Sequence, residues 1–375
     1  MKIAVNTRLL LKDKLDGIGL FTLETFKELV ATHPEVEFIF IFDRTPHPDF
    51  VFAKNIVAKV IHPQARHPLL FRIWHQFSLK RFLNRKKPDI FIATDGMIPL
   101  NCKVKTLAVI HDLCFEHYPE HIPTLYRNYF QKYYPKFAKQ ATRIATVSEF
   151  SKLDIQKTYH IETNKIDVVY NGSNSSFKPL NLAEQDKIKS EYTDGHDFFL
   201  FIGTLHPRKN LINLFVGFDN FKSESKSPLK LLIVGRKMWW TKEMEDTLNN
   251  LTHKTEIIFT DRITEDKLVK ITASAYTLTY IPLFEGFGIP LVEAMSCGVP
   301  VITSNVTSMP EVTENAGILI NPNSTKEITE ALLKVTSDVE FRNSLSIKSL
   351  EQAKKFSWKK TSDLLWSSIQ KTIHA

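Results

Sequence analysis

Short apolar runs and longer stretches with helical spacing alternate along the whole chain. Runs rich in β-branched and aromatic side chains and bounded by turn residues predict seven strands in the first half: Lys2–Asn6, Val36–Phe42, Asn55–Val60, Asp89–Ala93, Lys105–Ile110, Arg143–Val147 and Lys165–Val169. The same pattern predicts six strands in the second half: Phe198–Ile202, Leu229–Val234, Glu256–Thr260, Thr277–Ile281, Val299–Thr303 and Gly317–Leu319. Stretches with helical spacing, such as 19–31 and 150–159, separate several of them. Strands that alternate with helices are typical of parallel sheets with crossover helices, so the sequence predicts the α/β class.

A polar stretch between Asn171 and Asp194 divides the two series of strands. We therefore predict two doubly wound, Rossmann-like domains, 1–178 and 179–357, which suits a chain of 375 residues. The last segment, 358–375, has helical spacing and no following strand, so it either caps the second domain or packs back on the first. Two such domains facing each other would bind ligands in a cleft at the carboxyl ends of their strands.

Composition and charge limit the partners and the compartment. Lys and Arg (49) outnumber Asp and Glu (41), and the net charge of +8 favours phosphate-bearing ligands or an anionic surface. No basic cluster sits in a recognition motif, so we expect no nucleic-acid partner. The three cysteines lie far apart in the sequence, and neither a signal peptide nor an apolar run of about 18 residues is evident. We therefore expect a cytoplasmic protein.

The stretch FEGFGIPLVEAMSCGVPV, from Phe284 to Val301, holds two glutamates on either side of a glycine-rich turn. The glycines and Pro290 keep Glu285 on a loop and place Glu293 on the following helix. Backbone amides of such a turn, with the helix N-terminus, suit a bound diphosphate, and the glutamates could accept hydrogen bonds from sugar and ribose hydroxyls. The alternative is an ordinary strand-to-helix turn with a solvated Glu285.

The length of this stretch gives it a family likeness. It resembles the glutamate-x7-glutamate signature of retaining glycosyltransferases of family 4, which have the GT-B fold. The residues that match are Glu285, Gly286, Phe287, Gly288, Pro290, Glu293, Ala294, Gly298, Pro300 and Val301. The resemblance implies transfer of a sugar from a nucleotide donor to an acceptor hydroxyl with retention at the anomeric carbon. It assigns the donor sugar to Glu285 and the ribose to Glu293, with Gly286, Phe287 and Gly288 in the donor site.

A second match, FIGTLHPRKNL, opens the second domain, where Gly203 ends a strand. Arg208 and Lys209 precede the next helix, and a cationic pair there can neutralise charge on a departing nucleoside diphosphate. In the family the matching basic residues bind that diphosphate. Many relatives carry an arginine directly after the glycine, where this chain has Thr204. The alternative is a solvated loop pair.

The first domain carries two further candidates. Gly17 and Gly19 follow the first strand and resemble the family's glycine loop at the donor phosphate, although Asp16 there could simply cap a helix. A third glycine in the dinucleotide-binding register is missing, which argues against an NAD site.

His111 directly follows the apolar strand Leu107–Ile110 and begins the segment HDLCFEHYPEHIP. This segment resembles the family segment whose histidine lies near the sugar and acceptor. The alternative is a structural histidine.

Two other segments are candidates for contact with the nucleobase and with a membrane. Arg262 and Ile263 match the region where relatives seat the nucleobase. In the basic segment 66–87, Leu70, Trp74 and Phe77 form an apolar stripe among cationic side chains. Such a stripe is found in helices that lie on anionic membranes, but also in helices that pack on a sheet.

The resemblance also indicates which cofactor, donor and acceptor to expect. Asp-x-Asp, the usual metal-chelating motif of the other large glycosyltransferase fold, does not occur in the chain, so we expect no metal and no other cofactor. The segments HDLCFEHYPEHIP and GTLHPRKNL look most like those of bacterial mannosyltransferases of polysaccharide assembly, such as lipopolysaccharide. GDP-mannose is therefore the first expected donor and a UDP-sugar the second, with a glycan or lipid-linked saccharide as acceptor. A sugar-nucleotide epimerase or hydrolase, and an inactive nucleotide-binding protein, stay open as alternatives.

Overall fold

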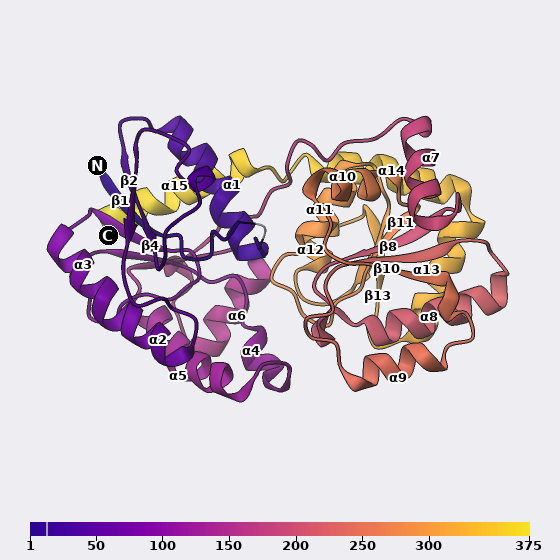
Figure 1. Ribbon diagram of the computed structural model, residues 1–375, viewed down its shortest axis with the longest axis horizontal. Coiled ribbons are helices and arrows are strands. Elements are labelled where there is room, and N and C mark those ends of the chain that lie inside the picture. The colour runs from indigo at the N-terminus through magenta and orange to yellow at the C-terminus, as the bar shows by residue number, and fades with distance from the viewer. Residues whose placement is uncertain (13) are drawn as a thin grey trace. The chain divides into compact units, whose positions relative to one another are not determined.

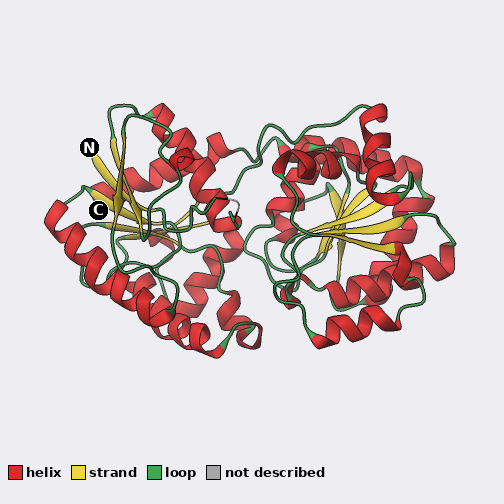
Figure 2. Cartoon of the chain, viewed as in Figure 1, coloured by secondary structure: helices red, strands yellow, loops and turns green. Residues whose placement is uncertain are grey.

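The chain folds into two compact units. The structure, a computed structural model, describes residues 1–12 and 14–375. The first unit comprises Met1–Gly172 and Trp358–Ala375, and the second comprises Ser173–Ser357. The division after Gly172 falls six residues before the domain boundary that we placed after residue 178. In each unit, helices cover both faces of a central sheet (Figures 1 and 2).

The first unit is built on a seven-stranded parallel sheet with the order β3-β2-β1-β4-β5-β6-β7. Its strands are β1 (Lys2–Asn6), β2 (Glu37–Phe42), β3 (Ile56–Val60), β4 (Ile90–Ala93), β5 (Thr106–Val109), β6 (Arg143–Thr146) and β7 (Ile166–Val168). Its helices are α1 (Gly17–Thr32), α2 (Pro68–Ile73), a π-helix (Trp74–Leu79), α3 (Lys80–Lys86), α4 (Cys114–His117), α5 (Thr124–Gln140), α6 (Glu149–Tyr159) and α15 (Trp358–His374). Short 3-10 helices span Pro48–Phe50, Pro119–His121 and Thr163–Lys165.

The second unit is built on a six-stranded parallel sheet with the order β10-β9-β8-β11-β12-β13. Its strands are β8 (Phe198–Ile202), β9 (Lys230–Val234), β10 (Ile257–Thr260), β11 (Thr277–Tyr280), β12 (Val301–Ser304) and β13 (Gly317–Ile320). Its helices are α7 (Leu182–Thr193), α8 (Leu211–Ser225), α9 (Lys242–Asn250), α10 (Glu265–Ser274), α11 (Ile289–Ser296), α12 (Met309–Thr313), α13 (Thr325–Ser337) and α14 (Val339–Ala353). Short 3-10 helices span Pro207–Lys209 and Lys254–Glu256.

The predicted α/β class and the thirteen predicted strands are confirmed, each strand within two residues of its expected bounds. Central strands such as β4 and β8 are buried along their whole length, because helices cover both faces of a parallel sheet. In both sheets the strand order reverses once, between β1 and β4 and between β8 and β11. Such reversal points are where doubly wound sheets bind ligands, so the loops after these four strands are the first place to look for a site.

Helix α15 belongs to the first unit, where it packs beside α1 (Figure 1). The ring of Trp366 stacks on His33 at 3.6 Å between centroids. Lys371 Nζ lies 2.9 Å from Asp167 Oδ1, and Lys105 Nζ donates to the Ile373 carbonyl at 2.6 Å. The sequence allowed this helix either to cap the second domain or to pack back on the first. The structure shows that it packs on the first unit.

The apolar stripe expected in segment 66–87 does not form a single face. Trp74 is fully buried and donates its Nε1–H to the Ile61 carbonyl at 2.8 Å, whereas Phe77 is 63% exposed. The reason is the π-helix of Trp74–Leu79, whose wider turns move Phe77 off the face that Trp74 buries. Leu70 is half-buried. Within residues 1–12 and 14–375, no helix has the length and apolarity needed to cross a bilayer.

Candidate active site

The turn between β11 and α11 brings one of the two glutamates of the signature to a pair of cations. Gly288 is the N-cap of α11 with φ of 88°, and a Cβ there would lie 2.9 Å from the Met309 side chain, so the turn requires glycine. Pro290 lies in the first turn of α11, as expected. The turn is tied to α12 because the Ser308 hydroxyl donates to the Glu285 carbonyl at 2.9 Å.

The buried Glu285 forms a cluster with the two half-buried basic residues of the loop after β8. Its carboxylate is only 2.8 Å from Arg208 Nη1 and 2.5 Å from Lys209 Nζ, and the residue is 8% exposed. Lys209 also donates to the Tyr280 hydroxyl at the end of β11. Burial alone would raise the pKa of Glu285, but the charges of Arg208 and Lys209 outweigh it and lower that pKa. The cluster thus brings two cations and one anion together.

The loop after β8 is built to hold this cationic pair. Arg208 and Lys209 form the end of a 3-10 helix, and the His206 Nδ1 accepts a hydrogen bond from the Arg208 amide at 3.2 Å. Asn210 Nδ2 donates to the Pro322 carbonyl at 2.6 Å, which ties the loop to the end of β13. Gly203, at the start of this loop, lies close to Gly235, which follows β9. A Cβ on Gly235 would lie only 1.9 Å from the Gly203 carbonyl oxygen. The loops after β8 and β9 therefore fit together only with glycine at 235.

Glu293 is placed very differently from Glu285. It lies on α11, is 7% exposed, and its carboxylate makes no hydrogen bond or ion pair with the residues that the structure describes. Burial, followed by the nearby charge of Glu265, raises the pKa of Glu293 to about 8. A buried carboxyl without a partner is costly unless it is protonated or a ligand supplies donors.

The predicted nucleobase residues stand on the loop between β10 and α10. Arg262 is exposed and Ile263 half-buried. The same loop leads directly into Glu265, whose charge acts on Glu293. The structure therefore brings the 262–263 loop and α11 to the same part of the second unit.

In the first unit, Gly17 and Gly19 form the first turn of α1, and the Asp16 carboxylate accepts a hydrogen bond from the Gly19 amide at 2.9 Å. Asp16 is therefore the N-cap of this helix, which was the alternative role that the sequence suggested for it.

His111 lies at the carboxyl end of β5, with Nε2 2.9 Å from the Thr94 carbonyl. Its ring packs edge-on against Phe21 of α1 at 5.1 Å. Burial lowers the pKa of His111, so the imidazole is neutral near pH 7.

Sequence reasoning missed several polar residues beside these sites. Tyr280 and Ser308 contact Lys209 and Glu285, and nothing in their spacing marks them. Arg8 and Asp95 form a buried ion pair after β1 and β4. That pair did have a signal: each is a charged residue within two positions of the end of a strongly apolar strand.

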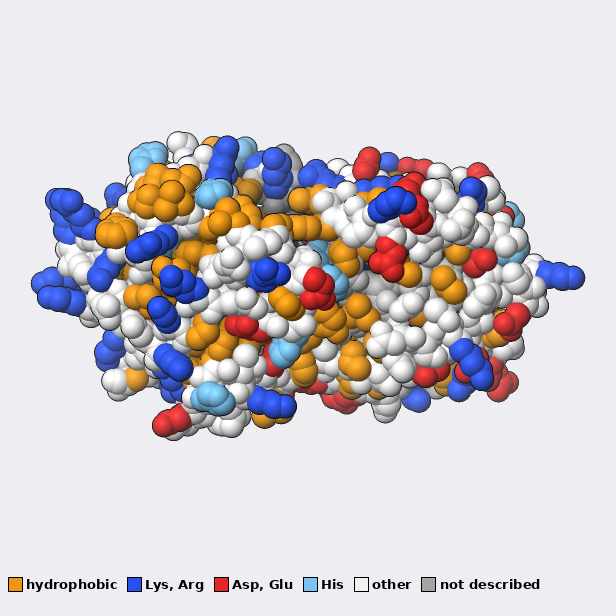
Figure 3. Space-filling model, turned by 90° about the horizontal axis from the view of Figure 1, so that it is seen from below, with side chains coloured by type: hydrophobic (Ala, Val, Ile, Leu, Met, Phe, Trp, Pro, Cys, Tyr) orange, Lys and Arg blue, Asp and Glu red, His pale blue; other side chains and the backbone are white. Residues whose placement is uncertain are grey.

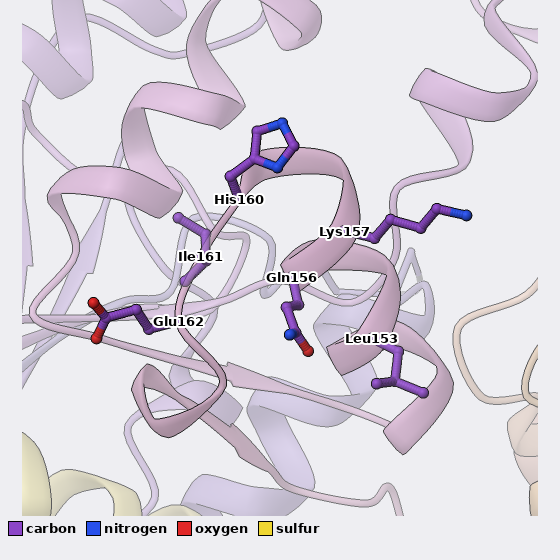
Figure 4. Close-up of a pocket in the computed structure, with 6 residues that line it drawn as sticks. All are labelled: Leu153, Gln156, Lys157, His160, Ile161 and Glu162. Carbon is purple, nitrogen blue, oxygen red and sulfur yellow. The ribbon is translucent and has the colours of Figure 1, made fainter.

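A pocket at the end of α6 in the first unit contains none of the predicted site residues. Its lining side chains come from the last turns of α6 and the loop that follows (Figure 4): Leu153, Gln156, Lys157, His160, Ile161 and Glu162. Its charged lining residues Lys157 and Glu162 are exposed, and none of its polar lining side chains is buried. We therefore place no chemistry there.

Both units match families of known proteins. The family described as Glycosyltransferase Family 4 matches residues 15–177, and the family described as Glycosyl transferases group 1 matches residues 183–352. Two doubly wound parallel sheets, one with a glutamate-flanked turn beside a cationic loop, define a glycosyltransferase of the GT-B fold. The chain belongs to the family 4 glycosyltransferases.

Individual relatives share most of the chain. It is 29% identical over 360 residues to O-antigen chain mannosyltransferase B of Escherichia coli, covering 93% of this chain and 94% of the relative. It is also 29% identical over 297 residues to O-antigen chain mannosyltransferase RfbU of Salmonella typhimurium, covering 76% of each. The fold is similar to that of Anabaena HepE, solved with UDP and glucose (TM-score 0.77, 14% identity, 99% of both chains). WaaG, a glycosyltransferase involved in lipopolysaccharide biosynthesis, is similar as well (TM-score 0.76, 15% identity, 96% and 97% of the chains).

Proposed function

We propose that the protein transfers mannose from GDP-mannose to a hydroxyl of a glycan or lipid-linked saccharide, with retention at the anomeric carbon, during synthesis of a cell-surface polysaccharide. The observation that supports this most is the cluster of Glu285, Arg208 and Lys209 beside the glycine-rich turn, with Glu293 lacking a partner among the described residues. The mannosyltransferase relatives favour this sugar and this kind of acceptor.

Each site residue has a role in this proposal. Arg208 and Lys209 bind the diphosphate, Glu285 the donor sugar and Glu293 the ribose hydroxyls. His111 contacts the transferred sugar. The remaining contacts to the donor are assigned to Gly17, Gly19, Gly203, Arg262, Ile263, Gly286, Phe287 and Gly288.

The chemistry that we propose needs no nucleophile from the enzyme. The bond between the anomeric carbon and the diphosphate oxygen breaks, and the acceptor oxygen bonds to that carbon from the same face. The departing diphosphate takes the proton of the acceptor hydroxyl. Negative charge grows on the diphosphate as it leaves, and fixed cations in a buried site stabilise this charge far better than water does. Glu285 holds Arg208 and Lys209 in place through contacts of 2.8 and 2.5 Å.

The donor is tested with a thermal-shift panel of GDP, UDP, ADP and their common sugar conjugates, each with and without excess chelator. A donor at about 100 times its dissociation constant stabilises the folded protein by roughly 2.7 kcal/mol. GDP and GDP-mannose are expected to raise the melting temperature, with the same shift in chelator because no metal is proposed. A shift confined to UDP compounds would replace GDP-mannose by a UDP-sugar, and dependence on Mg²⁺ or Mn²⁺ would remove metal independence.

Transfer is distinguished from the alternative activities by the acceptor. A transferase releases GDP from GDP-mannose in proportion to added acceptor, and NMR of the product gives an anomeric configuration equal to that of the donor. An epimerase or hydrolase would consume the donor without acceptor, and an inactive binding protein would show the thermal shift without turnover.

We further propose that the protein works in the cytoplasm, with the first unit in peripheral contact with an anionic membrane. Its three cysteines are free thiols. Leu69 of α2 is 60% exposed, Phe77 63% and Leu125 of α5 51%. Figure 3 shows apolar side chains interspersed with Lys and Arg on this part of the first unit. The exposed basic residues of the segment are Arg66, Arg72, Arg81, Arg85, Lys86 and Lys87.

The membrane contact is tested by sedimentation with vesicles that contain an anionic lipid. The double variant Leu69→Ser/Phe77→Ser is expected to bind about tenfold more weakly, because two apolar side chains no longer enter the interface. Leu182→Ser is the matched control, since Leu182 is 74% exposed but lies on the second unit. Equal binding of all three proteins, or no binding by the native protein, would argue against contact through this segment.

A further inference from the structure

A buried ion pair lies where the strand order of the first sheet reverses. Arg8 follows β1 and Asp95 follows β4, and they are 7% and 4% exposed. Arg8 Nε and Nη2 donate to Asp95 Oδ2 at 2.9 and 2.8 Å. Asn6 Nδ2 donates to the same oxygen at 2.9 Å, and the Met97 amide donates to Oδ1 at 3.1 Å. Both carboxylate oxygens of Asp95 are thus held inside the unit.

Burying two charges is not an efficient way to stabilise a fold. The cost of removing them from water often exceeds their mutual attraction, and apolar residues of the same size can be as stable or more so. A pair of this kind is better explained by the geometry that it fixes. The Asp95 carbonyl accepts from the Tyr134 hydroxyl at 2.8 Å, so the loop after β4 is held from the backbone as well.

This loop carries the hydrogen-bond partner of His111. The Thr94 hydroxyl donates to the Asn6 carbonyl at 2.7 Å, and the Thr94 carbonyl lies 2.9 Å from His111 Nε2. A carbonyl oxygen only accepts, so the proton of the neutral imidazole must be on Nε2. No residue that the structure describes hydrogen-bonds to Nδ1, which is then left with its lone pair as an acceptor.

We propose that Arg8 and Asp95 are positioning residues for His111: they hold the Thr94 carbonyl that keeps the proton on Nε2, so that Nδ1 accepts a hydrogen bond from a substrate hydroxyl. The role of His111 toward substrate rests on the proposed function, whereas its tautomer does not. His111 then acts as a neutral acceptor and stabilises no negative charge. The second anchor of its ring, Phe21, comes from α1, the helix that begins with Gly17 and Gly19.

The tautomer is tested first, in the ligand-free protein, by long-range ¹H–¹⁵N NMR of histidine-labelled samples between pH 7 and 8. The native protein is expected to show His111 protonated on Nε2. Asp95→Asn is expected to give a mixture of tautomers, because Arg8 is left without its counter-ion and the loop after β4 moves. Asp95→Asn could also unfold, so the double variant Arg8→Met/Asp95→Leu, which removes both charges and keeps the volume, is measured beside it.

Asp167→Asn is the matched control. Arg143 and Asp167 also form an arginine–aspartate pair, with both contacts at 2.9 Å, but this pair is half-buried and lies at the other end of the sheet. This variant is expected to lose stability without any change in the His111 signals. If native His111 carries its proton on Nδ1, or if Asp95→Asn and the double variant leave its tautomer unchanged, the proposal is wrong.

Turnover gives the second readout. A positioning loss of the order of 1 Å costs up to about a hundredfold in rate, so the folded double variant is expected to show kcat lower by about ten- to a hundredfold. The KM for the nucleotide donor should change far less, because Arg208 and Lys209, to which the diphosphate is assigned, belong to the second unit. Normal kcat in a variant with a mixed tautomer would overturn the catalytic part of the proposal. A failure to find any transfer by the native protein would instead overturn the proposed function and leave the tautomer result standing.

Discussion

Lys209→Ala is expected to lower kcat/KM for sugar transfer by about two to three orders of magnitude, the usual cost of losing one fixed group that stabilises developing charge. Lys209 does two things in the structure. It supplies a cation at the loop after β8, and it holds Glu285 at 2.5 Å and also contacts Tyr280. Its loss therefore weakens both the diphosphate contact and the placement of the glutamate assigned to the sugar. Initial rates over a range of donor concentrations, together with the thermal shift by GDP, measure both effects.

The control for this variant is Lys222→Ala. Lys222 is 7% exposed, lies 3.6 Å from Glu256, and stands on α8 away from the candidate site. Its removal is expected to lower stability while leaving kcat/KM within about twofold of the native value. If Lys209→Ala keeps full activity and full nucleotide binding, the assignment of the diphosphate to the loop after β8 fails. An equal loss in both variants would show that activity is limited by folding.

The fold could be predicted because the signal for a buried parallel strand is strong. Strands such as β4 and β8 are apolar along their whole length, and glycine, proline and polar residues bound them. The loop position of Glu285 and the helical position of Glu293 followed from Gly288 and Pro290, which restrict the backbone locally. Local rules were sufficient wherever the backbone itself was constrained.

Contacts between distant segments could not be predicted in the same way. The sequence placed Lys209 and Glu285 in one site only through family resemblance, and it did not indicate that they pair with each other. The exposure of Phe77 depends on a π-helix, for which no sequence signal was evident. The position of α15 depends on Trp366 and Lys371 meeting residues more than 200 positions away. These three features depend on contacts between segments that are distant in the sequence, and local sequence patterns do not encode such contacts.

Glu293→Gln is expected to stabilise the second unit at alkaline pH. The pKa of Glu293 is raised from 4.5 to about 8 by burial and by Glu265. Between these two values the unfolded chain is ionised while the folded protein keeps the proton, so stability is fully present below pH 4.5 and falls as pH rises to 8. The slope is about 1.4 kcal/mol per pH unit for one group. The neutral amide removes this slope.

Hydrogen–deuterium exchange of peptides from α11 at pH 5, 7 and 9 measures this stability without interference from the first unit. At pH 9 the variant is expected to be more stable by about 2 to 4 kcal/mol, since burying an unpaired amide offsets part of the gain. At pH 5 most of this gain is absent while the cost of the amide remains, so the variant is expected to be as stable as the native protein or less stable by up to about 2 kcal/mol. Equal stability at pH 9 would mean that Glu293 is solvated or paired in the free protein.

The same substitution is expected to weaken nucleotide binding by about tenfold above pH 8, because hydrogen bonds to an ionised carboxylate are about twice as strong as those to an amide. Hydroxyls of the ribose donate best to the ionised form, so the affinity of the native protein for GDP should rise as pH increases from 7 to 9, and that of Glu293→Gln should stay flat. Glu265→Gln separates the causes: removing the charge that helps to raise the pKa of Glu293 should move the midpoint of this rise to lower pH. If these results are obtained, Glu293 lowers stability at the pH where the donor binds best, which would explain a carboxyl at a position where an amide is more stable. A native affinity that is independent of pH would assign the ribose to another group.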